Sequence, residues 1–554
     1  MSAAVDSPLR VNAITPSRHR GSRRLRCPRR VGYAARVSIE QLLAQEFGSI
    51  PALIHEQARA RPAHAAVIAG DDRIDYAGLD ALVDRVAASL QRDGLGPGNA
   101  IAISASASIA YVAIYLGALR AGVSVAPLQP SVTPDSLVAM ADDAGASYLF
   151  LDAAVATSLA SATRPPAALR IALDGSGAGR SLADWLVPAG TAPRPVELDP
   201  EAPFNLIYSS GTTGTPKGII QSHGMRWAHV RRGGLVGYGP DTVSLTSTPL
   251  YSNTTLVAVF PTLSLGGTLV MLPRFDAAEF LRLAERHRVT HAMLVPVQYD
   301  RLLRHENFDK TDLSSFKMKF STSAPFSAAL KAEVLERWPG GLIEYFGMTE
   351  GGGTLMLIAH LHRRKLHTVG QPVEGHDIRV IDEQGRELPR GEVGEIVGAS
   401  PATMTGYHGR PEATAAAEWY DATGKRFIRT GDLGSVDDDG FFTIVGRRKD
   451  VIISGGFNIY PIDLETALIA HPAVAEAAVV GVPSARWGET PVAYVVLAAG
   501  QTADTEALRT FANARLGSTQ RIADVAVIPA LPRSPIGKVL KRELREMYAG
   551  PARG

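Results

Sequence analysis

The chain has 554 residues, of which 45% are hydrophobic, so it is long enough for more than one domain and a large buried core. Its only cysteine, Cys27, excludes an internal disulfide and a cysteine metal site. We therefore expect a protein of a reducing, cytoplasmic compartment.

The formal net charge of +2 hides an asymmetry between the first residues and the rest. Residues 1–36 hold nine arginines and one acid, Asp6, whereas 48 basic and 54 acidic residues remain after them. Such a segment has the composition of an organelle transit peptide, of a basic arm for nucleic acid or anionic membrane, or of a disordered extension. We favour a disordered extension, because no apolar periodicity separates the arginines, and we expect no nucleic-acid partner.

Short β-rich runs then alternate with amphipathic helical stretches. Residues 65–69 predict a strand before a helix over 76–91, and residues 268–272 predict a strand before a helix over 277–287 that Asp276 caps. This alternation is typical of parallel sheets covered by helices.

Residues 100–119 form an uncharged run that is long enough to be mistaken for a membrane span. The run holds three serines and changes from a β-like to a helical pattern with small residues. We predict a buried strand followed by a packed helix, and no membrane span.

The most informative segment, residues 209–218, reads Ser-Ser-Gly-Thr-Thr-Gly-Thr-Pro-Lys-Gly and follows a strand predicted at 204–208. Its glycines let the backbone amides turn inward to form an anion nest, its hydroxyls add donors, and its lysine adds positive charge. The spacing is not that of a Walker A loop. The segment predicts a polyphosphate cradle, with a glycine-rich surface turn as the alternative. We assign the cradle to Ser209, Ser210, Gly211, Thr212, Thr213, Gly214 and Lys217.

Further motifs follow in a fixed order: Phe-Gly-Met-Thr-Glu at 346–350, Arg-Thr-Gly-Asp-Leu at 429–433, Gly-Arg-Arg-Lys-Asp at 446–450 and Pro-Arg-Ser-Pro-Ile-Gly-Lys at 532–538. With the cradle, this series resembles the adenylate-forming superfamily of acyl-CoA synthetases, luciferases and peptide-synthetase adenylation domains. The resemblance runs from residue 37 to residue 546. A further segment, Gly-Gly-Phe-Asn-Ile-Tyr-Pro at 455–461, looks like the signature of acyl-CoA ligases in particular.

The pattern and the resemblance together give an α/β fold. We expect a disordered extension at 1–36, a large AMP-binding N-terminal domain of helix-covered sheets at 37–447, and a small mobile C-terminal α/β domain at 448–554. Residues 373–447, with short strands and acidic turns, form a β-rich subdomain of the large domain.

The resemblance implies an acid–thiol ligase. A carboxylic acid and ATP give acyl-AMP and pyrophosphate, and CoA then gives acyl-CoA and AMP, with Mg²⁺ as the metal. Three alternatives remain: an acyl-AMP ligase that loads a carrier protein, a luciferase-like oxidation of the adenylate, and a non-catalytic binding protein. A homodimer is an option that the sequence leaves open.

The catalytic roles are those that the resemblance implies. Lys538 bridges the carboxylate oxygen and the α-phosphate as negative charge builds, and a moving domain delivers it. Thr349 contacts the α-phosphate. Glu350 holds Mg²⁺, a hard cation that favours carboxylate and phosphate oxygens.

The nucleotide contacts are also carried over from the family. Phe346, where the family usually has tyrosine, stacks on adenine, although a core role is the alternative. Asp432 accepts the ribose hydroxyls, Arg447 binds the ribose from the other side, and Lys449 is the hinge about which the small domain turns. The remaining contacts fall on Ser323, Ala324, Pro325, Gly347 and Met348.

Two more regions are assigned to the binding of the CoA acceptor and of the acid substrate. Gly455 and Gly456 border the CoA tunnel, where the absence of side chains leaves room for pantetheine. Ser252 stands where many acyl-CoA ligases have histidine and amino-acid-activating domains have aspartate, which argues against an amino-acid substrate. We expect a fatty or arylalkanoic acid and a role in fatty acid metabolism. The acyl pocket is assigned to His223, Trp227, Tyr251, Asn253, Gln298 and Gly351.

Overall fold

The structure is a computed structural model that describes residues 38–209, 217–517, 520–534 and 537–548. The extension at 1–36 and the cradle residues Ser210, Gly211, Thr212, Thr213 and Gly214 lie outside the described residues.

An eight-stranded sheet in the order β19-β9-β8-β4-β3-β5-β6-β7 contains the predicted strand before the cradle. Its inner strands are parallel, whereas β8 and β9, on either side of the cradle segment, pair antiparallel, as do β9 and β19. The strands are β3 (Ala100–Ser104), β4 (Ser124–Pro127), β5 (Ala146–Leu151), β6 (Leu169–Ala172), β7 (Arg180–Ser181), β8 (Pro203–Ser209), β9 (Lys217–Ser222) and β19 (Gly406–Tyr407).

A nine-stranded sheet has the order β16-β15-β14-β13-β12-β10-β11-β1-β2. The strands from β1 to β14 in this order are parallel, as expected, and the two edges are antiparallel, which the sequence pattern did not show. The strands are β1 (Ala65–Ala69), β2 (Asp72–Asp75), β10 (Val243–Thr246), β11 (Thr268–Met271), β12 (His291–Leu294), β13 (Met318–Ser321), β14 (Gly341–Gly347), β15 (Thr354–Ile358) and β16 (Gln371–Pro372).

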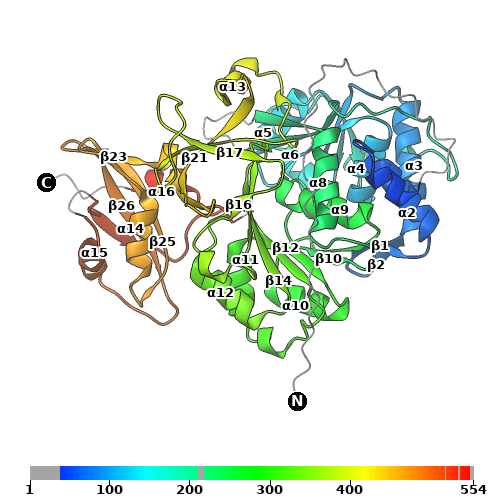
Figure 1. Cartoon of the computed structure of the whole chain (residues 1–554). Helices are drawn as coiled ribbons and strands as arrows, with labels where there is room; N and C mark the ends of the chain where they lie inside the picture. Colours follow the sequence, from blue (N-terminus) through cyan, green and yellow to red (C-terminus); the bar gives the residue numbers. More distant parts are fainter. Residues whose placement is uncertain (1–37, 210–216, 518–519, 535–536, 549–554) are drawn as a thin grey trace, which may run out of the picture. The chain divides into compact units, whose positions relative to one another are not determined.

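Helices connect these strands and cover the sheets. The predicted helix at 277–287 begins after Asp276, whose side chain accepts from the Glu279 amide, so the expected N-cap is confirmed. Helices α8 and α9 run side by side (Figure 1). The helices are α1 (Ile39–Leu43), α2 (Ile50–Ala60), α3 (Tyr76–Arg92), α4 (Ile109–Arg120), α5 (Pro134–Asp143), α6 (Ala153–Leu159), α7 (Leu182–Trp185), α8 (His223–Leu235), α9 (Asn253–Ser264), α10 (Ala277–Arg286), α11 (Pro296–Leu303) and α12 (Ala328–Arg337), with short 3₁₀ turns at Phe308–Lys310 and Arg363–Lys365.

The uncharged run at 100–119 is strand β3 followed by helix α4, both buried, so this prediction is confirmed. Within the described part of the chain, no helix is long and apolar enough to cross a membrane.

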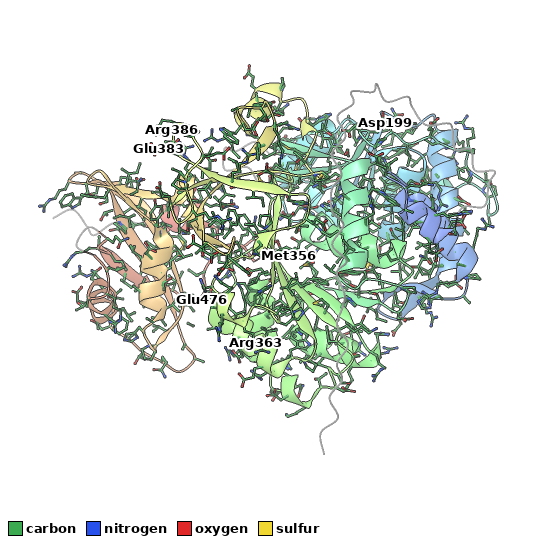
Figure 2. The ribbon with its side chains drawn as sticks, viewed as in Figure 1. Asp199, Met356, Arg363, Glu383, Arg386 and Glu476 are labelled. Atoms are coloured by element: carbon green, nitrogen blue, oxygen red, sulfur yellow. The ribbon has the colours of Figure 1, made fainter. Side chains whose placement is uncertain are left out.

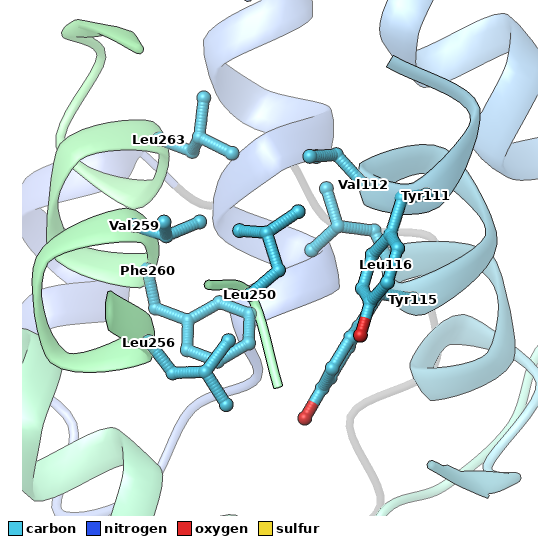
Figure 3. Close-up of a pocket in the computed structure, with 9 residues that line it drawn as sticks. All are labelled: Tyr111, Val112, Tyr115, Leu116, Leu250, Leu256, Val259, Phe260 and Leu263. Carbon is cyan, nitrogen blue, oxygen red and sulfur yellow. The ribbon is translucent and has the colours of Figure 1, made fainter. Parts of the chain in front are cut away.

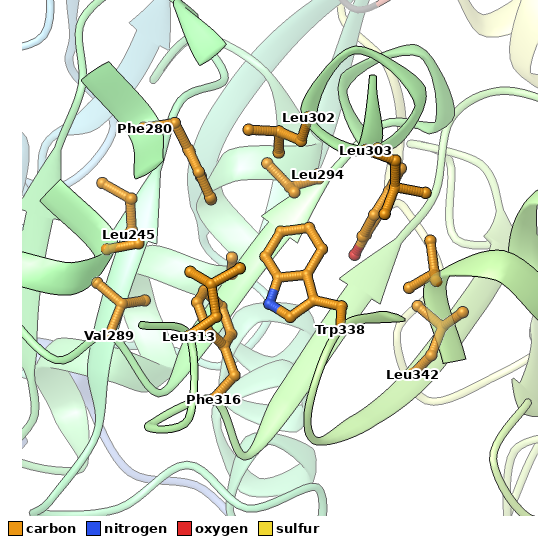
Figure 4. Packing of buried hydrophobic residues seen from close by; sticks show 14 of the residues in the cluster. Leu245, Phe280, Val289, Leu294, Leu302, Leu303, Leu313, Phe316, Trp338 and Leu342 are labelled. Carbon is orange, nitrogen blue, oxygen red and sulfur yellow. The ribbon is translucent and has the colours of Figure 1, made fainter. Parts of the chain in front are cut away.

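A hydrophobic core lies on the nine-stranded sheet around Trp338, which is buried among aromatic rings (Figure 4). The centroid of its ring lies 5.0 Å from Phe316 and 6.2 Å from Phe280. Edge-to-face contacts of this kind favour one fixed packing of the core.

The expected β-rich region is confirmed as a sheet in the order β17-β18-β21-β20, with β22 on β21. Its elements are β17 (Asp377–Ile381), β18 (Gly394–Ala399), α13 (Pro411–Ala416), β20 (Glu418–Tyr420), β21 (Arg426–Val436) and β22 (Phe442–Arg447).

The last residues form the expected small α/β unit, in which α14 packs against β25 (Figure 1). Its two hydrophobic clusters draw only on residues from Ile452 to Tyr548. The boundary at 447/448 stays a prediction. The elements are a 3₁₀ turn (Arg448–Asp450), β23 (Ile452–Ser454), β24 (Phe457–Ile459), α14 (Pro461–Ile469), β25 (Val474–Ser484), β26 (Gly488–Leu497), α15 (Thr505–Asn513), β27 (Asp524–Val527) and α16 (Lys541–Met547).

Candidate active site

The two ends of the cradle segment lie on adjacent antiparallel strands. Strand β8 ends at Ser209 and strand β9 begins at Lys217, and these two residues are register partners. The ammonium of Lys217 lies 5.3 Å from the centre of the Tyr407 ring, within the range of a cation–π contact.

Tyr407 connects this region to the predicted metal ligand. Its hydroxyl donates a 2.8 Å hydrogen bond to Oε1 of Glu350. Burial and the Glu350 carboxylate raise the pKa of Tyr407, so it stays a donor. Sequence reasoning missed Tyr407, because 57 residues separate it from Glu350 and no local pattern links the two.

The turn after β14 carries Thr349 and Glu350 and is held by its backbone. The Thr349 carbonyl accepts a 2.8 Å hydrogen bond from Nε2 of Gln221, and the Glu350 carbonyl accepts one of 2.8 Å from the Met404 amide. Gln221, which sequence reasoning also missed, lies four residues after Lys217 in the same strand.

Gly351 follows with φ +74°, and a Cβ there would lie 1.8 Å from the Ala402 carbonyl oxygen. Only glycine fits this close approach. Before this turn, Phe346 is half-buried and packs against the cluster of Leu355 and Val380, so its ring is held on one side by the core; Gly347 is exposed and Met348 half-buried.

Ser323 follows β13 in the left-handed region, with φ +79°. Its hydroxyl lies 2.6 Å from that of Thr254, near the start of α9. Ala324 beside it is half-buried and Pro325 is exposed. A non-glycine residue in this conformation is costly and is often found at functional sites.

Asp432 and Arg447 are register partners on β21 and β22 and form a 2.9 Å ion pair. Asp432 is buried, whereas the Arg447 side chain is 47% exposed. Burial raises the pKa of the Asp432 carboxyl, and the Arg447, Lys538 and Lys449 cations oppose this shift.

Lys538 is held in a tight turn and points into the same group of charges. The Ser534 amide donates to its carbonyl at 2.8 Å, its own amide donates to the Ser534 hydroxyl at 3.2 Å, and Gly537 before it has φ +77°. The surrounding protein and the Arg447 cation lower the pKa of Lys538, and the Asp432 and Glu350 carboxylates oppose this. Residues from four separate motifs are therefore close enough to influence each other's charge.

The hairpin of β23 and β24 turns at Gly455 and Gly456, whose φ angles are +58° and +83°. A Cβ on Gly456 would meet no atom within 4 Å, whereas one on Gly455 would meet the Trp487 ring at 3.0 Å. Around this turn, the side chains of Ile453, Phe457 and Trp487 are exposed.

The residues assigned to the acyl pocket do not all point to one place. His223 is buried with its ring 5.1 Å from Phe204, and burial lowers its pKa to about 4. Asn253 accepts a long 3.5 Å hydrogen bond from Gln221, which connects it to Thr349, and Tyr251 is half-buried.

Two of the acyl-pocket assignments have other contacts. The Trp227 ring packs against Phe47 and Gly48, and a Cβ on Gly48 would lie 2.7 Å from it. The Gln298 amide is used by its own helix and by Ser247: Oε1 accepts from the Val295 amide at 3.1 Å, and Nε2 donates to the Ser247 hydroxyl at 3.3 Å.

Helices α4 and α9 enclose a small apolar cavity of about 10 Å³, into which Tyr111 and Tyr115 extend (Figure 3). It has room for about one water molecule, so it is a packing gap and not an acyl pocket.

The residues at Glu350 suit a hard cation. In the described segments, no group of three or more His, Cys, Asp or Glu side chains is placed to hold a metal. Glu350 is half-buried and accepts from Tyr407 through one oxygen, which leaves its other oxygen for a hard cation such as Mg²⁺ shared with phosphate oxygens.

Comparison with known proteins assigns the family. Residues 54–408 match the family model "AMP-binding enzyme", and residues 463–538 match its C-terminal domain. The chain is 34% identical over 515 residues to a feruloyl-CoA synthase of Amycolatopsis sp., with 91% of this chain and 99% of the relative covered. It is 32% identical over 505 residues to the fatty acid–[acyl-carrier-protein] ligase ScoC of Streptomyces coeruleorubidus, with 89% and 95% covered.

Among solved structures, o-succinylbenzoate CoA synthetase (MenE) of Bacillus subtilis in complex with ATP and magnesium matches with a TM-score of 0.76. The two chains are 27% identical, and the match covers 89% of this chain and 98% of MenE. The motifs, the fold and these matches agree: the chain belongs to the AMP-binding enzymes, in the acid–CoA ligase branch of the adenylate-forming superfamily.

Proposed function

We propose that this enzyme is an ATP-dependent carboxylic acid–CoA ligase. It converts an acid and ATP to acyl-AMP and pyrophosphate, and then transfers the acyl group to CoA with release of AMP. The observation that carries this proposal is the approach of Lys538 to Glu350, Asp432 and Arg447, four charged residues from four separate motifs.

In the first step, this chain binds and orients the two substrates and neutralises the negative charge that develops between them. Lys217 and the cradle bind the triphosphate, Asp432 and Arg447 bind the ribose, and Phe346 stacks on the adenine. Lys538 stabilises the negative charge that develops between the carboxylate oxygen and the α-phosphorus, and Thr349 contacts the same phosphate. Glu350 would hold Mg²⁺, which when bound would neutralise part of the phosphate charge.

In the second step, the domain at 448–554 turns about Lys449. The exposed hairpin at Gly455 and Gly456 then borders the route of the thiol. The open space around Gly456 supports this role, because a thin pantetheine arm needs a wall without side chains.

The acid is a fatty or arylalkanoic acid. A second candidate acceptor is a carrier protein, since one relative is named a fatty acid–[acyl-carrier-protein] ligase. The exposed side chains of Ile453, Phe457 and Trp487 beside the hairpin also suit a protein surface.

The test is acid-dependent ATP–pyrophosphate exchange over a panel of acids, followed by addition of CoA or a phosphopantetheinylated carrier protein to the best one. We expect AMP and pyrophosphate only when an acid and Mg²⁺ are both present, and then an acyl-CoA. Release of ADP, or unchanged turnover in excess chelator, would contradict the proposal. Thioester formation on the carrier protein alone would favour the second candidate.

A further inference from the structure

Helix α8, which starts directly after the strand that begins at Lys217, carries basic side chains that are buried or half-buried. Arg226, His229 and Arg232 lie three residues apart on it, and Arg226 is 1% exposed. We call these three residues the α8 basic face. The spacing is visible in the sequence, but the burial is not.

The α8 basic face has no acidic partner among the residues that the structure describes. Arg226 donates through Nη2 to Oε1 of Gln221, while its Nε and Nη1 have no hydrogen-bond partner. Its guanidinium carbon lies 5.8 Å from each of the Phe204 and Phe260 rings. Nδ1 of His229 also has no hydrogen-bond partner.

The Arg232 end of the α8 basic face contacts strands β14 and β15. Arg232 lies 5.5 Å over the Tyr345 ring and donates a long 3.5 Å hydrogen bond to the Thr354 hydroxyl. Met356, labelled in Figure 2, is the register partner of Tyr345 and marks this pair of strands. His376 lies at the same pair of strands. Its Nδ1 accepts a 2.8 Å hydrogen bond from the Thr354 amide, so its Nε2 carries the proton and is a neutral donor.

The Arg226 and Arg232 cations are costly to hold away from water unless a counter-charge binds them. The neighbouring Arg231 on the same helix is exposed, so its cation keeps its hydration and has no such cost. Burial is the main reason why the pKa values of Arg226, His229 and Arg232 are lowered, and no carboxylate contributes to the pKa shift of any of the three.

The face begins at the proposed reaction centre. Arg226 is joined through Gln221 to the Thr349 carbonyl, next to the residues proposed to hold the phosphate and the metal. From there, the helix rise of about 1.5 Å per residue carries Arg232 about 9 Å further along the axis. His229, Arg232 and His376 remain partly accessible, as a group that lines a binding space would be.

We propose that this fatty or arylalkanoic acid carries a second carboxylate, which the α8 basic face binds while the first carboxylate is adenylated. This inference rests on the proposed function and names its substrate class. The preferred acid has its two carboxylates about 9 Å apart, the length of the face.

The test compares straight-chain α,ω-dicarboxylic acids of increasing length with their monomethyl esters and with monocarboxylic acids of the same length. Acid-dependent ATP–pyrophosphate exchange is the readout. We expect kcat/KM for the best diacid to exceed that for its monomethyl ester by about 30-fold or more, as for a desolvated charge pair. Esters or monocarboxylic acids that match the diacids would overturn the inference and leave the proposed function standing.

Arg232→Gln tests the residue, with exposed Arg231→Gln as the matched control. Arg232→Gln should raise KM for the diacid toward that of the monomethyl ester and leave monocarboxylic acids little changed, whereas Arg231→Gln should change neither. Because Arg232 has no carboxylate partner, Arg232→Gln should also melt no lower than the wild-type protein. A lower melting temperature with an equal loss for all acids would show a structural role and overturn the inference. Exchange with no acid at all would contradict the proposed function itself.

Discussion

The role proposed for Lys538 follows from the charged residues around it and not from the residue alone. Alone, an exposed lysine near a chain end is an ordinary surface charge. Here burial and the Arg447 cation lower the pKa of Lys538, and the Asp432 and Glu350 carboxylates oppose this shift. A cation held among the groups that we propose bind phosphate and ribose is suited to act where negative charge develops.

Lys538→Ala should abolish adenylation and spare the conversion of supplied acyl-AMP to acyl-CoA. The lost transition-state stabilisation is about 3–4 kcal/mol, by analogy with a removed oxyanion donor. Pyrophosphate exchange and thioester formation from synthetic adenylate measure the two steps separately. Equal loss of both in a folded variant would show that Lys538 acts in both.

At the scale of elements, loops and hairpins bring distant motifs together. Strand β19 pairs with β9, and this antiparallel pair places Tyr407 beside Lys217 and Glu350. In the C-terminal unit, the β23–β24 hairpin presents Gly455 and Gly456 at an exposed turn with positive φ angles.

Gly456→Trp should give the converse of Lys538→Ala, because its bulk fills the thiol route and leaves adenylation largely intact. Any side chain at φ +83° also strains the backbone by about 1–2 kcal/mol. Gly456→Ala carries the same strain without the bulk and is the control. The same two assays apply, and a tryptophan variant that keeps full thioester formation would remove Gly456 from the acceptor route.

Much of the fold could be predicted from local patterns. The strand over 65–69, the Asp276 cap and the strand and helix within 100–119 follow from periodicity and capping alone. The antiparallel edges of the sheets could not, because pairing direction depends on contacts between distant segments. The motifs indicated the candidate site residues, both on strands such as β21 and β22 and in turns. Tyr407 and Gln221 were missed because their contacts with Glu350 and Thr349 are tertiary and leave no local pattern. The i, i+3, i+6 spacing of Arg226, His229 and Arg232 was the one available signal for the α8 basic face.

At the scale of the whole molecule, buried histidines set the response to acid. His223 and His291 are 4% and 1% exposed, and burial lowers the pKa of each to about 4, below the value of 6.5 for a free side chain. The unfolded chain therefore binds these protons at a higher pH than the folded chain, and stability rises with pH across this interval.

The free energy of unfolding should fall as the pH drops from 6.5 to 4, by up to about 3 kcal/mol for each of these histidines. His291→Gln should flatten this slope, even if it lowers stability at neutral pH. Denaturant unfolding at a series of pH values measures the slope, with exposed His367→Gln as the control. An unchanged slope in His291→Gln would show that His291 does not titrate in this way.

Removal of residues 1–36 should leave turnover and melting temperature unchanged, because every motif assigned to the site lies after them. Steady-state kinetics of the truncated and full chains test this. A large loss of activity in a folded truncation would assign a catalytic or assembly role to the extension.

Strand β9 and helix α8 form one piece without a loop, since Ser222 both ends the strand and caps the helix through the Met225 amide. The proposed nucleotide end and the proposed acyl end of the site therefore lie on one continuous strand–helix unit. The position of a residue along the helix sets its distance from the nucleotide end. Moving the terminal arginine from position 232 to position 228, about one turn nearer to Lys217, would shorten the distance between the two ends of the proposed site by about 6 Å. Relatives could in this way change the length of acid they select by relocating one side chain, with the adenylation machinery left as it is.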